Sequence, residues 1–174
     1  MKIQLIFPLC CLLLTGCGEV KTDVPAPEVI TEKALPAPGT TADQALATGE
    51  VEWLQDLEAV KAKAGQQGKV ILADFSGSDW CHWCMKLDEE VFSKPEFKQF
   101  AGQNLVLFLV DFPNRKQLPP ETAAQNRKLA DKYGVQGYPT VLLLDAGGNL
   151  LATTGYKEGG AAAYVEHLKG LLKK

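Results

Sequence analysis

Ser78-Asp79-Trp80-Cys81-His82-Trp83-Cys84 is the stretch on which the interpretation of this chain depends. It comes after the apolar run 69–75, which predicts a buried strand, and it precedes a segment with helical periodicity. A helix that begins at or near Cys81 places Cys81 and Cys84 on one face, so that their sulfurs can approach to bonding distance. Cys81 then occupies the helix N-terminus, where unpaired N–H groups and the helix dipole favour a thiolate. The stretch therefore predicts a reactive dithiol.

The composition fits one globular domain with appendages. The chain has 174 residues, of which 46% are hydrophobic and 22% are charged. The formal net charge is -3, and there is no basic stripe or arginine-rich segment, which gives no support to a nucleic-acid-binding role. The five cysteines fall into two groups, with Cys10, Cys11 and Cys17 near the N-terminus and Cys81 and Cys84 between residues 78 and 84.

Residues 1–17 have the pattern of an export signal. A short basic segment at 1–2 is followed by an apolar run at 3–14, which is shorter than the roughly 20 residues of a membrane-spanning helix. Leu14-Thr15-Gly16-Cys17 resembles the bacterial lipobox, in which the cysteine is lipidated and becomes the mature N-terminus. We therefore expect residues 1–16 to be a lipoprotein signal peptide; an ordinary secreted protein and an uncleaved anchor are the alternatives. The resemblance implies a domain in the cell envelope, on the periplasmic side of a bacterial membrane and anchored through Cys17. By the enteric sorting pattern Gly18, which is not aspartate, favours the outer membrane, and the inner membrane is the alternative.

Residues 17–48 differ in composition from the remainder of the chain. They are rich in proline and alanine, as in Val24-Pro25-Ala26-Pro27, and no apolar period persists. Such spacers are extended and semi-rigid, at about 3.1 Å per residue where the polyproline conformation holds. We expect this segment to be a tether that sets how far residues 49–174, the predicted folded domain, can search for partners.

Residues 49–174 show a regular alternation of elements. The patterns predict helices at 50–65, from Cys81 to Lys94, at 95–102, at 121–133 and at 159–172, with strands at 69–75, 104–111, 140–144 and 150–154. The strand–helix–strand portion implies parallel pairing, and the closing hairpin implies antiparallel pairing. The predicted fold class is α/β, with helices on both faces of one mixed sheet.

These elements and their motifs resemble thioredoxin over about residues 50–173. The resemblance rests on a strand that ends in Asp74-Phe75, on Trp80-Cys-x-x-Cys opening a helix, and on Gly137-Tyr138-Pro139-Thr140 before a strand hairpin. The chain is also similar to thioredoxin-like proteins common among exported bacterial lipoproteins. His82-Trp83 replaces the Gly-Pro of thioredoxin, and the spacing from Asp74 to Cys81 is one residue longer. The resemblance implies a thioredoxin fold and a thiol–disulfide oxidoreductase.

The chemistry expected of the two cysteines is disulfide exchange. Cys81 attacks a substrate disulfide to form a mixed disulfide, and Cys84 resolves it. At a helix N-terminus the pKa of such a thiol falls from about 8.5 into the range of roughly 3.5–7.5. A protonated His82 would stabilise the Cys81 thiolate further; the alternative is an exposed histidine with little effect.

The resemblance implies roles for four other residues. Asp74 would assist proton removal from Cys84, since burial raises a carboxyl pKa towards the range of a general base; the alternative is a strand-end carboxylate bonded to local backbone. Trp80 would form part of the docking surface. Pro139 would be a cis-proline opposite the cysteines, and Tyr138 would offer its backbone to an extended substrate; the alternative is an ordinary trans turn.

Other uses of the cysteines fit less well. Zinc needs about four ligands, and apart from the crowded Cys81, His82 and Cys84 only His167 is available. Covalent c-type haem needs a histidine directly after the second cysteine, and residue 85 is Met. A permanent structural disulfide is the remaining alternative. We expect no metal and no cofactor.

The function expected from the sequence is an enzyme that reduces or shuttles disulfides on exported proteins. A reductase is favoured over an oxidant, although the direction depends on potentials that the sequence does not contain. Its partners would be protein disulfides or dithiols and a membrane or periplasmic redox protein. One alternative is a client-binding, chaperone-like module that keeps the fold. Another is a thiol reductase for cytochrome c maturation, which nothing in the sequence selects.

Overall fold

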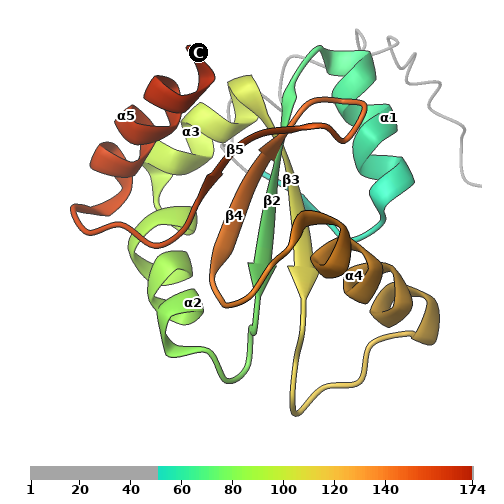
Figure 1. Cartoon of the computed structure of the whole chain (residues 1–174). Coiled ribbons are helices and arrows are strands. Elements are labelled where there is room, and N and C mark those ends of the chain that lie inside the picture. Colours follow the sequence, from blue (N-terminus) through green and yellow to red (C-terminus); the bar gives the residue numbers. More distant parts are fainter. Residues whose placement is uncertain (1–50, 174) are drawn as a thin grey trace, which may run out of the picture. The chain divides into compact units, whose positions relative to one another are not determined.

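The computed structural model describes residues 51–173 (Figure 1). The predicted signal peptide at 1–16, the lipidation site Cys17 and the tether at 17–48 lie outside the described residues and stay predictions. Within the described part, no helix is both long and apolar enough to cross a membrane.

The described residues form a mixed sheet of five strands in the order β1-β3-β2-β4-β5. The strands are β1 (Trp53–Leu54), β2 (Val70–Ser76), β3 (Leu105–Asp111), β4 (Thr140–Leu144) and β5 (Leu150–Thr154). Both β1 and β2 are parallel to β3, while β4 is antiparallel to β2 and to β5. The predicted combination of a parallel core with an antiparallel hairpin is therefore confirmed.

Helices cover both faces of this sheet (Figure 1). They are α1 (Leu57–Gln67), α2 (His82–Leu87), the π-helical turn η1 (Asp88–Phe92), α3 (Pro95–Asn104), α4 (Pro120–Tyr133) and α5 (Gly160–Leu172). One hydrophobic core joins the sheet to α2, η1, α3 and α5, and the other joins it to α1 and α4. Burial of each large apolar side chain contributes about 1.5–3 kcal/mol, so the two cores hold both layers against the central strands.

The alternation of side chains along β2 determines where Asp74 points. Ile71, Ala73 and Phe75 belong to the core shared with α1 and α4, whereas Leu72 belongs to the core shared with α2, η1, α3 and α5. Since alternate residues of a strand share a face, Asp74 lies on the same face as Leu72. The strand therefore directs this carboxyl towards the layer that contains the cysteine helix.

The predicted helix at 50–65 is wrong at its start. Trp53 and Leu54 form β1 and pair with Leu107 and Phe108 of β3, because two apolar residues are too few to distinguish a helix from a strand. The helix begins only after Asp56, whose Oδ1 accepts the N–H of Ala59 at 2.7 Å as an N-cap.

The end of α1 and the path after α2 also differ from prediction. Gly65 lies inside α1, and Gly68 alone ends it, in the left-handed region at φ 63°. The π-helical turn at η1 was not predicted, because a short turn with wide hydrogen bonds, such as that from the N–H of Ser93 to the carbonyl of Asp88 at 2.9 Å, leaves no sequence period. The predicted restart of the chain as a helix at Pro95 is confirmed, with Pro95 in the first turn.

Candidate active site

Cys81 and Cys84 form a disulfide at the start of α2, with their Cα atoms 5.2 Å apart. Cys81 is the N-cap residue of this helix, and its Sγ accepts the N–H of Cys84 at 3.2 Å. The predicted placement of the pair is confirmed. An N–H directed at Sγ, added to the dipole of the helix, favours the thiolate of Cys81 once the disulfide opens.

Both cysteines of the disulfide are buried. Cys81 is 7% exposed and Cys84 is 4% exposed, whereas their neighbours Trp80 and Trp83 are exposed. Both cysteines are therefore shielded in the oxidised state, and aromatic side chains form much of the surface beside them.

Trp80 lies beside the disulfide and is 43% exposed. Its Nε1 donates to the carbonyl of Phe112 at 2.8 Å, and its ring stands perpendicular to that of Tyr138, with centroids 5.9 Å apart. A Cβ at Gly77 would come within 2.5–2.8 Å of three atoms of the indole. The absence of a side chain at Gly77 is therefore what lets the indole lie flat against the loop.

We expect Gly77→Ala to lower the free energy of unfolding by about 1–3 kcal/mol, because the added methyl must displace the Trp80 indole from its bond to Phe112. Urea unfolding followed by tryptophan fluorescence measures this. Gly137→Ala is the matched control, since a Cβ there would meet nothing within 4 Å. Equal effects of the two substitutions would contradict the assignment.

The Tyr138–Pro139 peptide bond is cis, as predicted. Thr140, the next residue, pairs with Phe75 near the end of β2. Pro139 and the active-site loop, residues 77–80, therefore both lie beyond the same end of the sheet. The ring of Tyr138 also contacts that of Phe112, with centroids 5.2 Å apart. Trp80 and Tyr138 thus form one continuous aromatic surface between the cysteines and the cis-proline.

Asp74 is 6% exposed, and its Oδ1 has no hydrogen-bond partner among the described residues. Burial raises the pKa of Asp74 from 3.8 to about 7, and the negative charges of Asp88 and Asp111 add to this rise. The predicted rise in pKa is confirmed. An unpartnered Oδ1 does not fit the alternative of a carboxylate bonded to local backbone.

His82 is exposed, and its ring contacts the edge of Trp83, with centroids 5.6 Å apart. Trp83 in turn packs against Tyr156 at 5.2 Å, and Nζ of Lys86 lies 5.3 Å from each of these two rings. The hydroxyl of Tyr156 donates to Glu90 at 2.6 Å. This cluster of His82, Trp83 and Tyr156 was not predicted, because Tyr156 comes from the loop after β5, far from Trp83 in the sequence.

A second unpredicted feature joins the active-site loop to the loop after β3. The backbone N–H and the Oγ of Ser78 donate to the two carboxylate oxygens of Asp111, at 2.9 and 2.6 Å. Asp111 is the last residue of β3 and is buried. The start of the active-site loop is therefore bound directly to the central sheet.

Asp79 extends this connection. Its carboxylate accepts the backbone N–H groups of Asn114, Arg115 and Lys116 at 2.9, 2.7 and 3.2 Å. The N–H of Asn114 is the largest of the effects that lower the pKa of Asp79, and the other two N–H groups act in the same direction. Residues 77–80 and 112–116 thus form a single unit, held mostly by side-chain bonds to backbone.

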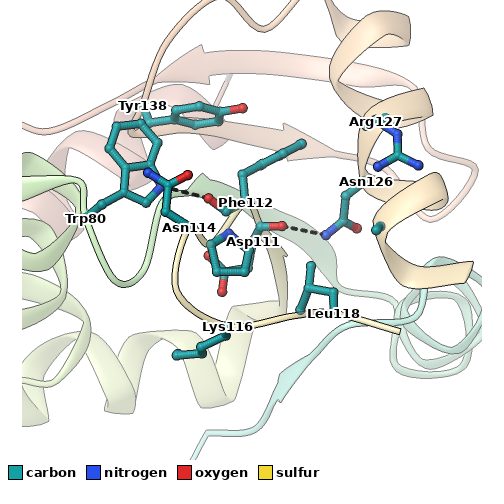
Figure 2. A pocket seen from close by; sticks show the side chains of 11 residues that line it. Trp80, Asp111, Phe112, Asn114, Lys116, Leu118, Asn126, Arg127 and Tyr138 are labelled. Atoms are coloured by element: carbon teal, nitrogen blue, oxygen red, sulfur yellow. Dashed lines mark hydrogen bonds between the residues drawn. The ribbon is translucent and has the colours of Figure 1, made fainter. Parts of the chain in front are cut away.

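A pocket of about 310 Å³ opens between this unit and α4 (Figure 2). Its lining includes the three aromatic side chains Trp80, Phe112 and Tyr138, the two cations Lys116 and Arg127, and Asn126 and Asp111. Asn126 is buried, and its Nδ2 donates to the carbonyl of Asp111 at 2.9 Å. Nothing in the sequence indicated this pocket, since its walls come from segments far apart in the chain.

Residues 57–169 match the family model of the thioredoxin-like domain. The chain is 39% identical over 128 residues to the disulfide bond reductase DsbH of Chlamydia pneumoniae, covering 74% of this chain and 76% of that protein. It is 29% identical over 127 residues to the thiol:disulfide interchange protein DsbD of Colwellia psychrerythraea, covering 71% of this chain but only 19% of the length of DsbD.

Among solved structures, one described as DsbH oxidoreductase superposes with a TM-score of 0.69 at 36% identity, and the match covers 80% of this chain and 95% of the other. A match of this extent includes the sheet and the helices on both of its faces. Taken with the Cys81–Cys84 disulfide at the start of α2, these findings show that the chain belongs to the thioredoxin-like family and is a thiol–disulfide oxidoreductase.

Proposed function

We propose that this protein is a disulfide reductase that acts on exported proteins in the bacterial cell envelope. The observation that carries the proposal is the position of the cysteine pair at the start of α2, where Sγ of Cys81 accepts the N–H of Cys84. The similarity to a protein named disulfide bond reductase supports the reducing direction. The lipobox-like Leu14-Thr15-Gly16-Cys17 supports a lipid anchor at Cys17 and a periplasmic location.

The reducing cycle begins with Cys81 as a thiolate. It attacks one sulfur of the substrate disulfide, that S–S bond breaks, and the released substrate thiolate takes up a proton. The thiol of Cys84 then loses its proton and attacks Sγ of Cys81. The mixed disulfide breaks, the second substrate thiol leaves, and the cycle ends in the Cys81–Cys84 disulfide.

Asp74 is the proposed acceptor of the Cys84 proton. Its carboxyl faces the layer that contains α2, and its pKa of about 7 lets it hold or release a proton near neutral pH. Its Oδ1 has no competing hydrogen bond among the described residues, so that atom is free to accept the proton.

The substrate is expected to lie in extended form across Trp80, Tyr138 and Pro139. Backbone groups beside the cis-proline would pair with the substrate strand, and the half-exposed indole of Trp80 would cover it. His82 borders the same site on the side of Trp83. A membrane or periplasmic redox protein would then return electrons to Cys81–Cys84, as a dithiol that attacks the disulfide in the reverse exchange.

The reduction potential of the Cys81–Cys84 pair tests the direction of transfer. We expect a value near that of thioredoxin, about −270 mV, because a reductant must stay oxidisable by its substrates. Equilibration with glutathione or dithiothreitol buffers, followed by quantification of free thiols, gives the number. A value near about −120 mV, typical of a strong oxidant, would overturn the reductase proposal and leave the exchange chemistry in place.

A further inference from the structure

The pocket between the active-site loop and α4 begins at the residues that flank the reaction centre. Trp80 directly precedes Cys81, and Tyr138 directly precedes the cis-proline Pro139. Figure 2 shows both aromatic rings at one end of the pocket and Arg127 at the other. A substrate strand held at Cys81 and Pro139 would therefore pass the mouth of this pocket.

The polar side chains at the floor of the pocket already form hydrogen bonds within the protein. Nδ2 of the buried Asn126 donates to the carbonyl of Asp111, and its Oδ1 accepts from Gln125 at 3.2 Å. The two oxygens of the Asp111 carboxylate each accept a hydrogen bond from Ser78. These bonds hold the walls of the pocket in place, and we expect recognition to depend mainly on the aromatic side chains and on the rim.

The rim of the pocket carries two cationic side chains, Lys116 and Arg127, that form no ion pair within residues 51–173. Among these residues, Nζ of Lys116 reaches only Oγ of Ser78, at 3.4 Å. Asp79 attracts Lys116 at longer range, but its own oxygens are occupied by three backbone N–H groups. The exposed Lys116 and Arg127 thus keep donors available to a ligand.

We propose that this pocket is a subsite for an acidic side chain, Asp or Glu, close in sequence to the substrate cysteine. Arg127 and Lys116 bind its carboxylate, and the rings of Trp80 and Phe112 cover its aliphatic part. The proposal rests on the proposed function, since it assumes a peptide substrate at Cys81. A volume of about 310 Å³ lies at the small end of ligand pockets, which suits one or two side chains rather than a cofactor.

The test uses three disulfide-bonded peptides that differ at one position near the cysteine, carrying Glu, Gln or Lys. The full chain is compared with Arg127→Glu and with Lys128→Glu. Lys128 is the matched control because it is exposed on the same helix, changes the net charge equally and does not line the pocket. Turnover of each peptide gives kcat/KM. The affinity of the same peptides is measured with a double variant, Cys81→Ser with Cys84→Ser, in which each charge substitution is also made. This affinity requires no chemical step.

We expect the Glu peptide to have the highest kcat/KM and affinity, and Arg127→Glu to lower both by about tenfold for this peptide and less than about twofold for the Gln peptide. Lys128→Glu should change neither, and the preference for Glu should fade as salt screens it. Equal effects of the two substitutions, or equal binding of all three peptides, would overturn the subsite. Retained preference for Glu in binding with no reduction of any peptide would uphold the subsite and count against the reductase.

Discussion

We expect Cys81→Ser to abolish the reduction of insulin disulfides and Cys84→Ser to stop the reaction at a covalent complex. These are the expected results if Cys81 is the attacking sulfur, because a serine hydroxyl at the N-cap of α2 cannot replace the thiolate, whereas loss of Cys84 removes only the resolving step. Insulin turbidity measures turnover, and non-reducing electrophoresis measures the complex. The complex should disappear on addition of dithiothreitol.

The same pair of variants separates an enzyme from a client-binding module. A module that holds clients through its surface would bind them equally well in the wild type, in Cys81→Ser and in Cys84→Ser. A covalent complex with Cys81→Ser in place of Cys84→Ser would reverse the assigned roles. We assign attack to Cys81 because, among residues 51–173, its Sγ and not that of Cys84 accepts an N–H at the helix start.

Asp74→Asn is expected to stabilise the fold at alkaline pH while slowing turnover. The pKa of Asp74 is raised from 3.8 to about 7, so the folded state binds this proton more tightly than the unfolded chain. Stability from this group is fully present below about pH 4 and is lost as the pH rises towards 7. At 1.36 kcal/mol per pH unit, the difference between 3.8 and about 7 amounts to at most about 4 kcal/mol.

Asparagine removes the ionisation and keeps the shape of the side chain. Urea unfolding should therefore give similar stabilities for the wild type and Asp74→Asn at pH 4 and a more stable variant at pH 8. Turnover near pH 7.5 should fall by about 100-fold, the lower end of the effect of a positioned acid–base group. Asp88→Asn serves as the control that keeps the carboxyl of Asp74. It should lower the pH at which stability changes, since Asp88 is the larger of the two charges that raise this pKa.

Local patterns explain why the central part of the site could be predicted. The spacing of Cys81 and Cys84, the strand before them and the helix after them are all short-range features, and the structure places Cys81 at the N-cap as expected. Asp74 was recognisable as a carboxyl within an apolar run. The cis bond before Pro139 followed from the family resemblance, since the sequence around it would also allow a trans turn.

Long-range polar contacts explain what could not be predicted. Asp79 bonds to backbone groups 35 to 37 residues away, and Tyr156 bonds to Glu90 across 66 residues. Such contacts depend on loops whose sequences have no period, so no pattern indicates them. The error at β1 has a similar origin, since its two residues are identified as a strand only by their pairing with β3.

The bonds that join residues 77–80 to 111–116 involve no sulfur atom. Opening the Cys81–Cys84 bond breaks none of them directly, so we expect the protein to present the same contact surface in its oxidised and reduced states. Such a surface would be available to the substrate and to the electron donor alike. The substrate and the electron donor would then compete for this surface and bind to it in turn. No conformational change of the surface would select which of them binds next.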